Sequence, residues 1–145
     1  MKVKELMTQT PVQIAPGESV AVAARTLTHY NIGALPVCNA AGTLCGVVTD
    51  RDLVIRCVAA GKDPGKTTVR EVMTGKVACA SPDMEVRVAA HLMGQQQVRR
   101  LPVVEGGRLC GMLSLGDLTK REETTPDAAD VLADVTDNVC RPDGW

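Results

Sequence analysis

Length, composition and charge already exclude several classes of protein. The chain has 145 residues, which is the size of one compact domain or of two small ones. Sixteen Lys and Arg residues are balanced by seventeen Asp and Glu residues, for a formal net charge of −1, and the chain has no Phe, one Tyr and one Trp. The balanced charge argues against attraction to a phosphate backbone, and the lack of aromatic rings argues against base stacking. We therefore expect no nucleic-acid partner.

The sequence carries no signal for membranes or for metal. No apolar run approaches the roughly 18 residues of a membrane-spanning helix, and the start, MKVKELMTQT, lacks the apolar centre of a signal peptide. We expect a cytoplasmic protein without a membrane partner. The cysteines form no CxxC pair and several lie in apolar runs, so we expect them to pack as small apolar side chains. They are Cys38, Cys45, Cys57, Cys79, Cys110 and Cys140.

An internal repeat organises the chain. The motif VKELMT at residues 3–8 returns as VREVMT at residues 69–74, an offset of 66 residues. After one residue is lost in a turn, the motif LCG at residues 44–46 returns at residues 109–111. Two copies indicate a duplicated small domain rather than an open array of repeats. The expected organisation is repeat 1 at 1–65, repeat 2 at 66–121 and an acidic tail at 122–145.

Each repeat shows the same order of expected elements, β-α-β-β-α, which predicts a mixed α+β fold. A short extended segment precedes a Pro, and the helix after it carries apolar residues at the i, i+3, i+4, i+7 spacing of a core-facing helix. Two apolar runs joined by a Gly-containing turn then predict a hairpin, and a second helix follows. In repeat 1 we expect an extended segment at 12–15, a helix with Val20, Ala23, Ala24 and Leu27 on its apolar face, strands at 35–38 and 44–49 and a helix at 50–60. A linker follows at 61–67. In repeat 2 we expect an extended segment at 77–80, a helix with Val86, Ala89, Ala90 and Met93 on its apolar face, strands at 101–104 and 109–114 and a helix at 115–121, and after it a helical stretch at 128–135.

The segments GVVTDRD (46–52) and GMLSLGD (111–117) contain the most informative residues. Each places a hydroxyl, Thr49 or Ser114, where a helix begins and a carboxylate, Asp52 or Asp117, three residues later. A helix N-terminus favours a phosphate, and a carboxylate can accept hydrogen bonds from both vicinal hydroxyls of a ribose. The same spacing is also that of an ordinary helix cap. The recurrence of the pattern in both repeats favours a ligand site.

The motif G-h-h-T/S-x-x-D (h, apolar), the upstream h-P-V, the β-α-β-β-α order and the tandem copy resemble a pair of CBS domains, also called a Bateman module. The resemblance covers roughly residues 1 to 121, and the motifs recur in order in both halves. The segments NIGALPV (31–37) and TDRDL (49–53) are similar to those of stand-alone bacterial pairs.

The resemblance implies two repeats packed sheet to sheet about a pseudo-two-fold axis, with clefts for AMP, ADP, ATP, NAD or S-adenosylmethionine. Asp52 and Asp117 would hold ribose, and Thr49 and Ser114 would lie at a phosphate. It further implies a homodimer, an unidentified regulated protein as partner, no required cofactor and no chemistry on the ligand. The adenine pocket would be lined by Val12, Gly33, Ala34 and Pro36 in repeat 1 and by Val77 and Pro102 with the residues before it in repeat 2.

Charges around the two sites differ between the repeats. Arg99 and Arg100 stand where repeat 1 has Gly33 and Ala34, and Arg51 is replaced by Gly116. Because a guanidinium suits phosphate oxygens, we expect unequal sites, with the more phosphorylated ligand at the one that Arg99 or Arg100 lines.

The same residues leave three other functions possible in principle: an enzyme, a metal or redox sensor, and a module that only dimerises. An enzyme would need a partner group for His29 or His91, and the sequence shows no such motif beside either. A metal or redox sensor would use the cysteines and histidines. A third alternative is a dimerisation module that binds no ligand.

Overall fold

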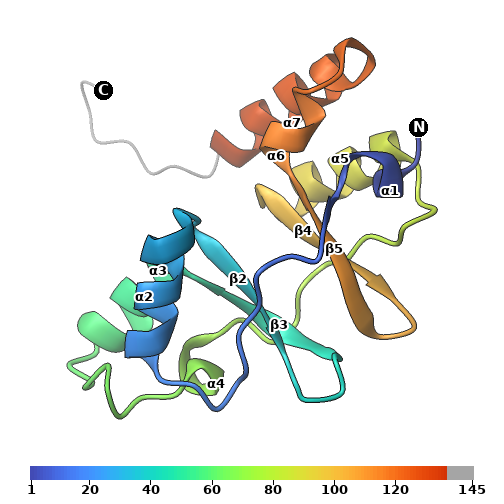
Figure 1. Cartoon of the computed structure of the whole chain (residues 1–145). Coiled ribbons are helices and arrows are strands. Elements are labelled where there is room, and N and C mark those ends of the chain that lie inside the picture. The colour runs from blue at the N-terminus through green and yellow to red at the C-terminus, as the bar shows by residue number, and fades with distance from the viewer. Residues whose placement is uncertain (137–145) are drawn as a thin grey trace, which may run out of the picture. The chain divides into compact units, whose positions relative to one another are not determined.

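The computed structural model describes residues 1–136 (Figure 1). Within them, the elements run α1 (Val3–Leu6), β1 (Thr8–Gln9), α2 (Val20–Tyr30), β2 (Ala34–Cys38), β3 (Leu44–Thr49), α3 (Asp50–Leu53), the π-helix η1 (Val54–Val58), α4 (Val69–Val72), α5 (Val86–Gln96), β4 (Arg100–Glu105), β5 (Arg108–Ser114), α6 (Leu115–Leu118), the 3₁₀ helix η2 (Glu122–Thr124) and α7 (Thr125–Thr136). The mixed α+β class predicted from the sequence is confirmed. The acidic tail begins with η2 and α7, and Cys140 lies outside the described residues.

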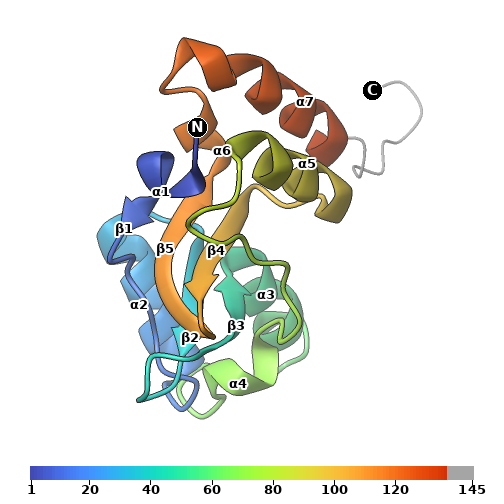
Figure 2. The same ribbon diagram turned by 90° about the vertical axis from the view of Figure 1, so that its right-hand side faces the viewer.

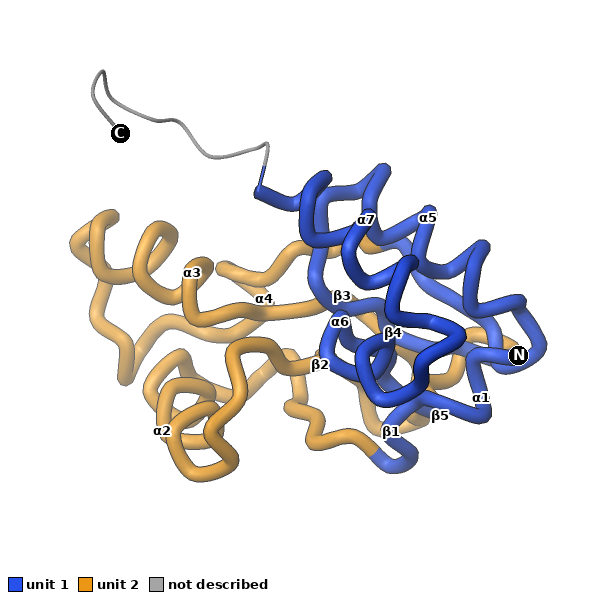
Figure 3. Tube along the Cα trace, turned by 90° about the horizontal axis from the view of Figure 1, so that it is seen from above, with its two compact units in different colours: residues 1–10, 78–105, 110–145 blue, residues 11–77, 106–109 orange. Residues whose placement is uncertain are grey.

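The chain divides into two compact units that do not coincide with the sequence repeats. Of the described residues, unit 1 comprises 1–10, 78–105 and 110–136, and unit 2 comprises 11–77 and 106–109 (Figure 3). The start of repeat 1 therefore belongs to the unit built mainly from repeat 2. The motif VREVMT at the start of repeat 2 belongs to the unit built mainly from repeat 1.

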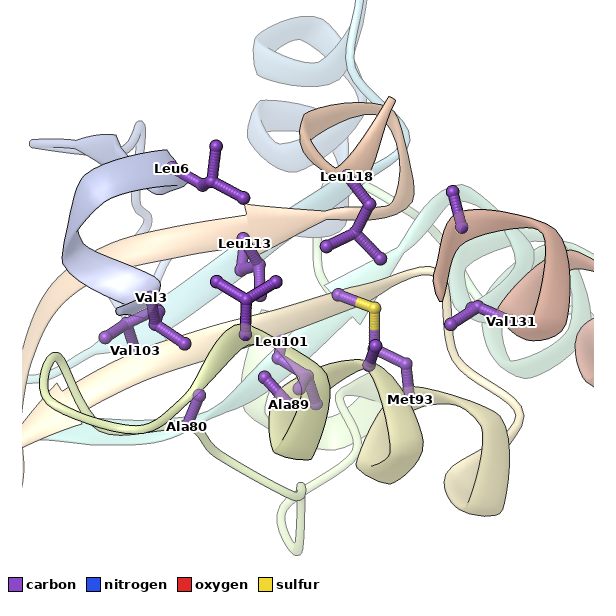
Figure 4. Close-up of a cluster of buried hydrophobic side chains, with 13 residues drawn as sticks. Val3, Leu6, Ala80, Ala89, Met93, Leu101, Val103, Leu113, Leu118 and Val131 are labelled. Carbon is purple, nitrogen blue, oxygen red and sulfur yellow. The ribbon is translucent and has the colours of Figure 1, made fainter. Parts of the chain in front are cut away.

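Each unit has its own hydrophobic core, and each core includes the exchanged motif. In unit 1, Val3 and Leu6 of α1 point toward Leu101 and Leu113 of the β4–β5 hairpin (Figure 4). In unit 2, the exchanged valines of α4 join the β2–β3 hairpin and α2 in a cluster formed by Ile14, Val20, Ala23, Leu27, Leu35, Val37, Val48, Leu53, Cys57, Val69 and Val72. Full burial of an aliphatic side chain contributes about 1.5–3 kcal/mol, so these short helices are held by packing rather than by their length.

A glycine in each hairpin makes room for the exchanged motif. Val47 and Thr74 form an antiparallel bridge, with N–H to O distances of 3.0 and 2.9 Å. A Cβ at the neighbouring Gly46 would overlap the carbonyl oxygen of Thr74. In unit 1, Gly111 pairs with Gln9 of β1, and a Cβ there would overlap the Met7 sulfur. The glycine of each LCG motif thus permits the close approach of another chain segment.

The extended segments expected before each first helix differ from the expectation. They are not strands: Ile14 and Ala80 each form a single parallel bridge, to Val37 and Val103. The two-residue β1, which the sequence pattern did not indicate, instead joins the sheet β1-β5-β4 of unit 1, while β2 and β3 pair in unit 2.

The second helices also differ from the expected ranges. The helix expected at 50–60 begins as α3 and continues as the π-helix η1, where Ala59 N–H donates to the Val54 carbonyl at 2.8 Å. The helix expected at 115–121 ends at Leu118. The linker is ordered against α2, because the Val20 and Ala21 N–H groups donate to the carbonyls of Thr67 and Pro64.

The helix α7 makes the two units unequal. It lies along α5 (Figure 2), and its Ala128 and Val131 are buried in the core of unit 1 together with Ala90. Ala24, at the equivalent position of α2, was expected on a core-facing stripe but is exposed. The stripe on α5 is therefore buried as expected because α7 covers it, whereas the stripe on α2 is buried only at Val20, Ala23 and Leu27.

Candidate functional site

The hydroxyl and the carboxylate of each expected site form a helix cap. Thr49 is the N-cap of α3: its Oγ1 accepts from Asp52 N–H at 3.1 Å, and its own N–H donates to Asp52 Oδ2 at 3.0 Å. Ser114 caps α6 in the same way with Asp117, at 3.2 and 2.8 Å. One oxygen of each carboxylate is thus engaged by a main-chain amide in both units, as an ordinary capping box requires.

The second carboxylate oxygen distinguishes the two positions. Asp52 Oδ1 lies 4.0 Å from Nε of Arg56, a distance beyond a hydrogen bond, and the Asp52 side chain is 15% exposed. Asp117 Oδ1 accepts a hydrogen bond from Lys120 Nζ at 2.7 Å, and the Asp117 side chain is 5% exposed. The Asp52 carboxylate therefore has a more accessible oxygen than the Asp117 carboxylate.

The residue that precedes each hairpin reaches the start of the second helix. In unit 2, the Gly33 carbonyl accepts from Asp50 N–H at 3.1 Å, next to Thr49, and Ala34 is the cross-strand neighbour of Thr49. In unit 1, the Arg99 carbonyl accepts from Leu115 N–H at 2.8 Å, next to Ser114. The structure thus brings together Gly33, Ala34, Thr49 and Asp52 in unit 2, and Arg99, Ser114 and Asp117 in unit 1.

The arginines that distinguish the repeats are exposed. Arg99 and Arg100 in unit 1 and Arg51 in unit 2 all have exposed side chains. Arg51 follows Thr49 by two residues, within the first turn of α3. Each unit therefore presents a guanidinium near its capped helix start, but from a different element.

The residues expected around the adenine ring separate into two groups. Ile14 N–H donates to the Pro36 carbonyl at 3.0 Å, which places the segment of Val12 beside β2 in unit 2. Ala80 N–H donates to the Pro102 carbonyl at 2.9 Å in unit 1, but Val77 falls in unit 2. Both valines are half-buried, while the two prolines are buried.

The cysteines of the described residues are buried or partly buried. Burial raises the pKa of the Cys38, Cys79 and Cys110 thiols above the ordinary value. The proximity of Cys45 raises the pKa of Cys38 further. Within residues 1–136, no three His, Cys, Asp or Glu side chains are grouped so that they could hold a metal ion. Over the same residues, no helix is both long and apolar enough to span a bilayer.

A family model described as "CBS domain" matches residues 3–58 and 69–124, which together are more than half of the chain. The chain belongs to the CBS-domain family. Its two CBS domains occur in tandem, so it is a CBS-pair regulatory module, as its sequence motifs indicated.

Known proteins of similar length share the pair. The chain is 37% identical to the CBS domain-containing protein YhcV of Bacillus subtilis over 134 residues, covering 92% of this chain and 94% of YhcV. It is 31% identical to hypoxic response protein 1 of Mycobacterium tuberculosis over 117 residues, covering 81% and 82% of the two chains.

Solved structures of CBS-domain proteins have the same fold. A crystal structure of hypoxic response protein I with two coordinated zinc ions has a TM-score of 0.78 at 30% identity, covering 83% of this chain and 98% of that one. A hexameric CBS-CP12 protein from bloom-forming cyanobacteria has a TM-score of 0.73 at 29% identity, covering 87% and 73%.

Two basic residues of the CBS site regions escaped the sequence analysis. Lys120 follows Asp117 by three residues and Arg56 follows Asp52 by four. The i,i+3 and i,i+4 spacing of opposite charges on a helix is a signal that could have identified both.

Proposed function

We propose that this CBS pair is a regulatory module for an adenosine-containing ligand such as AMP, ADP, ATP, NAD or S-adenosylmethionine. In the proposal, Asp52 and Asp117 accept hydrogen bonds from ribose hydroxyls. Thr49 and Ser114 lie at the phosphate, because their capping bonds use the hydroxyl only as an acceptor and leave its hydrogen to donate.

The observation that carries the proposal is the second oxygen of Asp52. A residue that served only to cap α3 would need one carboxylate oxygen, and Oδ2 already accepts the Thr49 N–H. Oδ1 is not within hydrogen-bond distance of the Arg56 guanidinium, and the side chain remains partly exposed at 15%. An ionised carboxylate with an available oxygen is the acceptor that a ribose hydroxyl requires.

The surroundings supply the other groups of a nucleotide site. In unit 2, the half-buried Val12 and Gly33, together with the buried Ala34 and Pro36, would line the adenine, and the exposed Arg51 is available to phosphate oxygens. In unit 1, Pro102 and the residues before it would line the adenine pocket, and Arg99 and Arg100 would bind phosphate oxygens. We propose that unit 1 takes the more highly phosphorylated ligand.

The test compares variants that preserve the helix cap. In Asp52→Asn the side-chain carbonyl can still accept the Thr49 N–H, while the second acceptor becomes an NH₂ donor. Thermal unfolding with AMP, ADP, ATP, NAD and S-adenosylmethionine should show stabilisation of the wild type, about 2.7 kcal/mol at 100 times Kd. The Asp52→Asn and Asp117→Asn variants should lose it in part, and the double variant entirely.

A second capping box of unit 2 provides the control. Glu71 accepts from the Thr68 N–H at the start of α4, as Asp52 does at α3, but it does not follow a buried strand. Glu71→Gln should leave ligand binding unchanged. Equal stabilisation of wild type and double Asp variant, or no stabilisation by any of the five compounds, would refute the proposal.

The proposed output is a change in pose rather than chemistry on the ligand. A ligand shifts an equilibrium only through its different affinity for two states, and the shifted state would then act on a regulated protein. Catalysis is not proposed. His29 packs edge-on against Tyr30, with ring centroids 4.7 Å apart, and His91 is exposed. Both imidazoles therefore lie on the surface.

We further propose that the chain is a homodimer. Unit 2 exposes Tyr30 at the end of α2 and Val54, Ile55 and Val58 on η1, with Val58 66% exposed. Exposed apolar clusters of this kind mark interaction surfaces. The hexameric CBS-CP12 protein is an example of self-association in the family. Sedimentation equilibrium should give a dimer mass for the wild type and a monomer mass for Val58→Asp.

The zinc ions of hypoxic response protein I keep a metal-sensing alternative open to test. Elemental analysis of protein purified without chelator discriminates between the two functions, because stoichiometric zinc would favour the metal sensor. The raised thiol pKa values of Cys38 and Cys110 favour the neutral form, which is the less reactive one, and so they argue against a redox sensor.

A further inference from the structure

The hydrogen-bonded ion pair between Lys120 and Asp117 differs from its counterpart in unit 2, where Arg56 Nε lies 4.0 Å from Asp52 Oδ1 and makes no hydrogen bond to it. Lys120 Nζ donates to Asp117 Oδ1 at 2.7 Å, and it does so on a carboxylate that is 5% exposed. With the offset of 65 residues that relates the LCG motifs, the residue equivalent to Lys120 is Ile55, whose side chain is exposed. The two repeats therefore offer the same carboxylate in two different charge environments.

The pair occupies Asp117 Oδ1, the oxygen that the proposed function assigns to a ribose hydroxyl in unit 1. Asp117 Oδ2 is held by the Ser114 N–H, so Oδ1 is the oxygen left for a ribose hydroxyl. Lys120 lies on it in the ligand-free protein. Because the Lys120 side chain is 63% exposed, it is free to swing away, whereas the buried carboxylate is not. A ribose can reach Asp117 only by sharing or displacing the ammonium group.

Displacement has a different consequence for neutral and for phosphorylated ligands. When adenosine displaces the ammonium group, the charge-assisted bond is lost and nothing replaces it. When a nucleotide displaces it, the phosphate provides a new anionic partner for the ammonium group, which strongly favours phosphate oxygens. In the proposed function the phosphate lies at Ser114, the N-cap of α6, and Lys120 lies just beyond the other end of this four-residue helix.

We propose that Lys120 is a specificity-determining residue that makes the Asp117 site selective for phosphorylated over neutral adenosyl ligands. This inference rests on the proposed function. The Asp52 site has Ile55 at the equivalent position and so lacks this ammonium group. It should discriminate less between neutral and phosphorylated adenosyl ligands. Removal of the lysine should therefore reduce the preference about tenfold, which is the lower end of the contribution of one charge-assisted hydrogen bond.

The experiment measures AMP and adenosine affinities by calorimetry, one site at a time. In the Asp52→Asn background, which leaves the Asp117 site, Lys120→Met should lower the ratio of AMP affinity to adenosine affinity about tenfold. Lys120→Arg should retain the ratio, because it keeps the charge. In the Asp117→Asn background, Ile55→Lys should raise the ratio at the Asp52 site, because it creates the same spacing of Lys and Asp.

The outcomes separate this inference from the proposed function. If AMP binds but the ratio of AMP affinity to adenosine affinity changes less than twofold in both Lys120→Met and Ile55→Lys, the role of Lys120 is overturned and the proposed function stands. Absence of AMP and adenosine binding to the wild type overturns both. Lys66→Met, which removes an exposed lysine of unit 2, is the control for a general change in charge and should leave the Asp117-site ratio unchanged.

Discussion

Replacement of Gly46 by Ala is the sharpest test of the exchanged motif in unit 2. A Cβ at Gly46 would overlap the Thr74 carbonyl oxygen and would lie 3.1 Å from the carbonyl carbon and 3.2 Å from Met73 Sδ. These are mostly backbone atoms, which cannot rotate away as the end of a side chain can. The segment around Thr74 must therefore move as a whole.

The magnitude follows from the contacts that this movement disturbs. The two hydrogen bonds between Val47 and Thr74 are each worth about 0.5–1.5 kcal/mol net, and overpacking a tight contact costs about 1–3 kcal/mol. Replacing a glycine gains about 0.4–1 kcal/mol through the unfolded state. We expect Gly46→Ala to lower the free energy of unfolding by about 2–3 kcal/mol.

Urea unfolding measures this change. With a slope of about 2 kcal/mol/M, the midpoint should fall by about 1–1.5 M. Gly75→Ala is the matched control, because Gly75 adjoins Thr74 and a Cβ there meets nothing within 4 Å. If Gly46→Ala unfolds at the same urea concentration as Gly75→Ala, the glycine is not needed for the approach of the exchanged motif, and the reasoning is wrong.

The remaining predictions concern packing, pH and the thiols. Val131→Ala should lower the free energy of unfolding by about 2 kcal/mol in urea titrations, because Val131 of α7 is buried in the core of unit 1. A loss of more than half that amount for Leu132→Ala, whose side chain is half-exposed on the same helix, would contradict the packing. Hydrogen bonds from Thr68 lower the pKa of the Glu71 carboxyl. The contribution of Glu71 to stability is therefore present above about pH 4.5 and is lost as the pH falls through the lower pKa of the folded state. The difference in thermal unfolding between wild type and Glu71→Gln should shrink on acidification, and a difference that grew would have the wrong sign. Burial and a raised thiol pKa should make Cys38 alkylate more slowly in the folded protein than in urea at pH 8, as followed by mass spectrometry, and equal rates would show that it is accessible.

The candidate site could be predicted only in part, for reasons visible in particular residues. The hydroxyl and carboxylate of Thr49 and Asp52 were identified because a cap is a local pattern over four residues. The pairing of Lys120 with Asp117 was missed, although the i,i+3 spacing points to it. Arg121 stands at the equally suitable i,i+4 spacing, so only the structure decided that Lys120 makes the bond. Val77 was assigned with repeat 2, whereas the chain folds it into unit 2.

The sequence by itself determined the duplication, the CBS family, the two amphipathic helices and the two hairpins with their caps, because each is specified by residues close together in the chain. Only the tertiary structure decided which copy of the VxExMT motif enters which core. Both copies present nearly the same apolar residues, so local pattern favours neither pairing. It also decided that Ala90 is buried and Ala24 exposed, since that difference depends on α7, which follows one repeat and not the other.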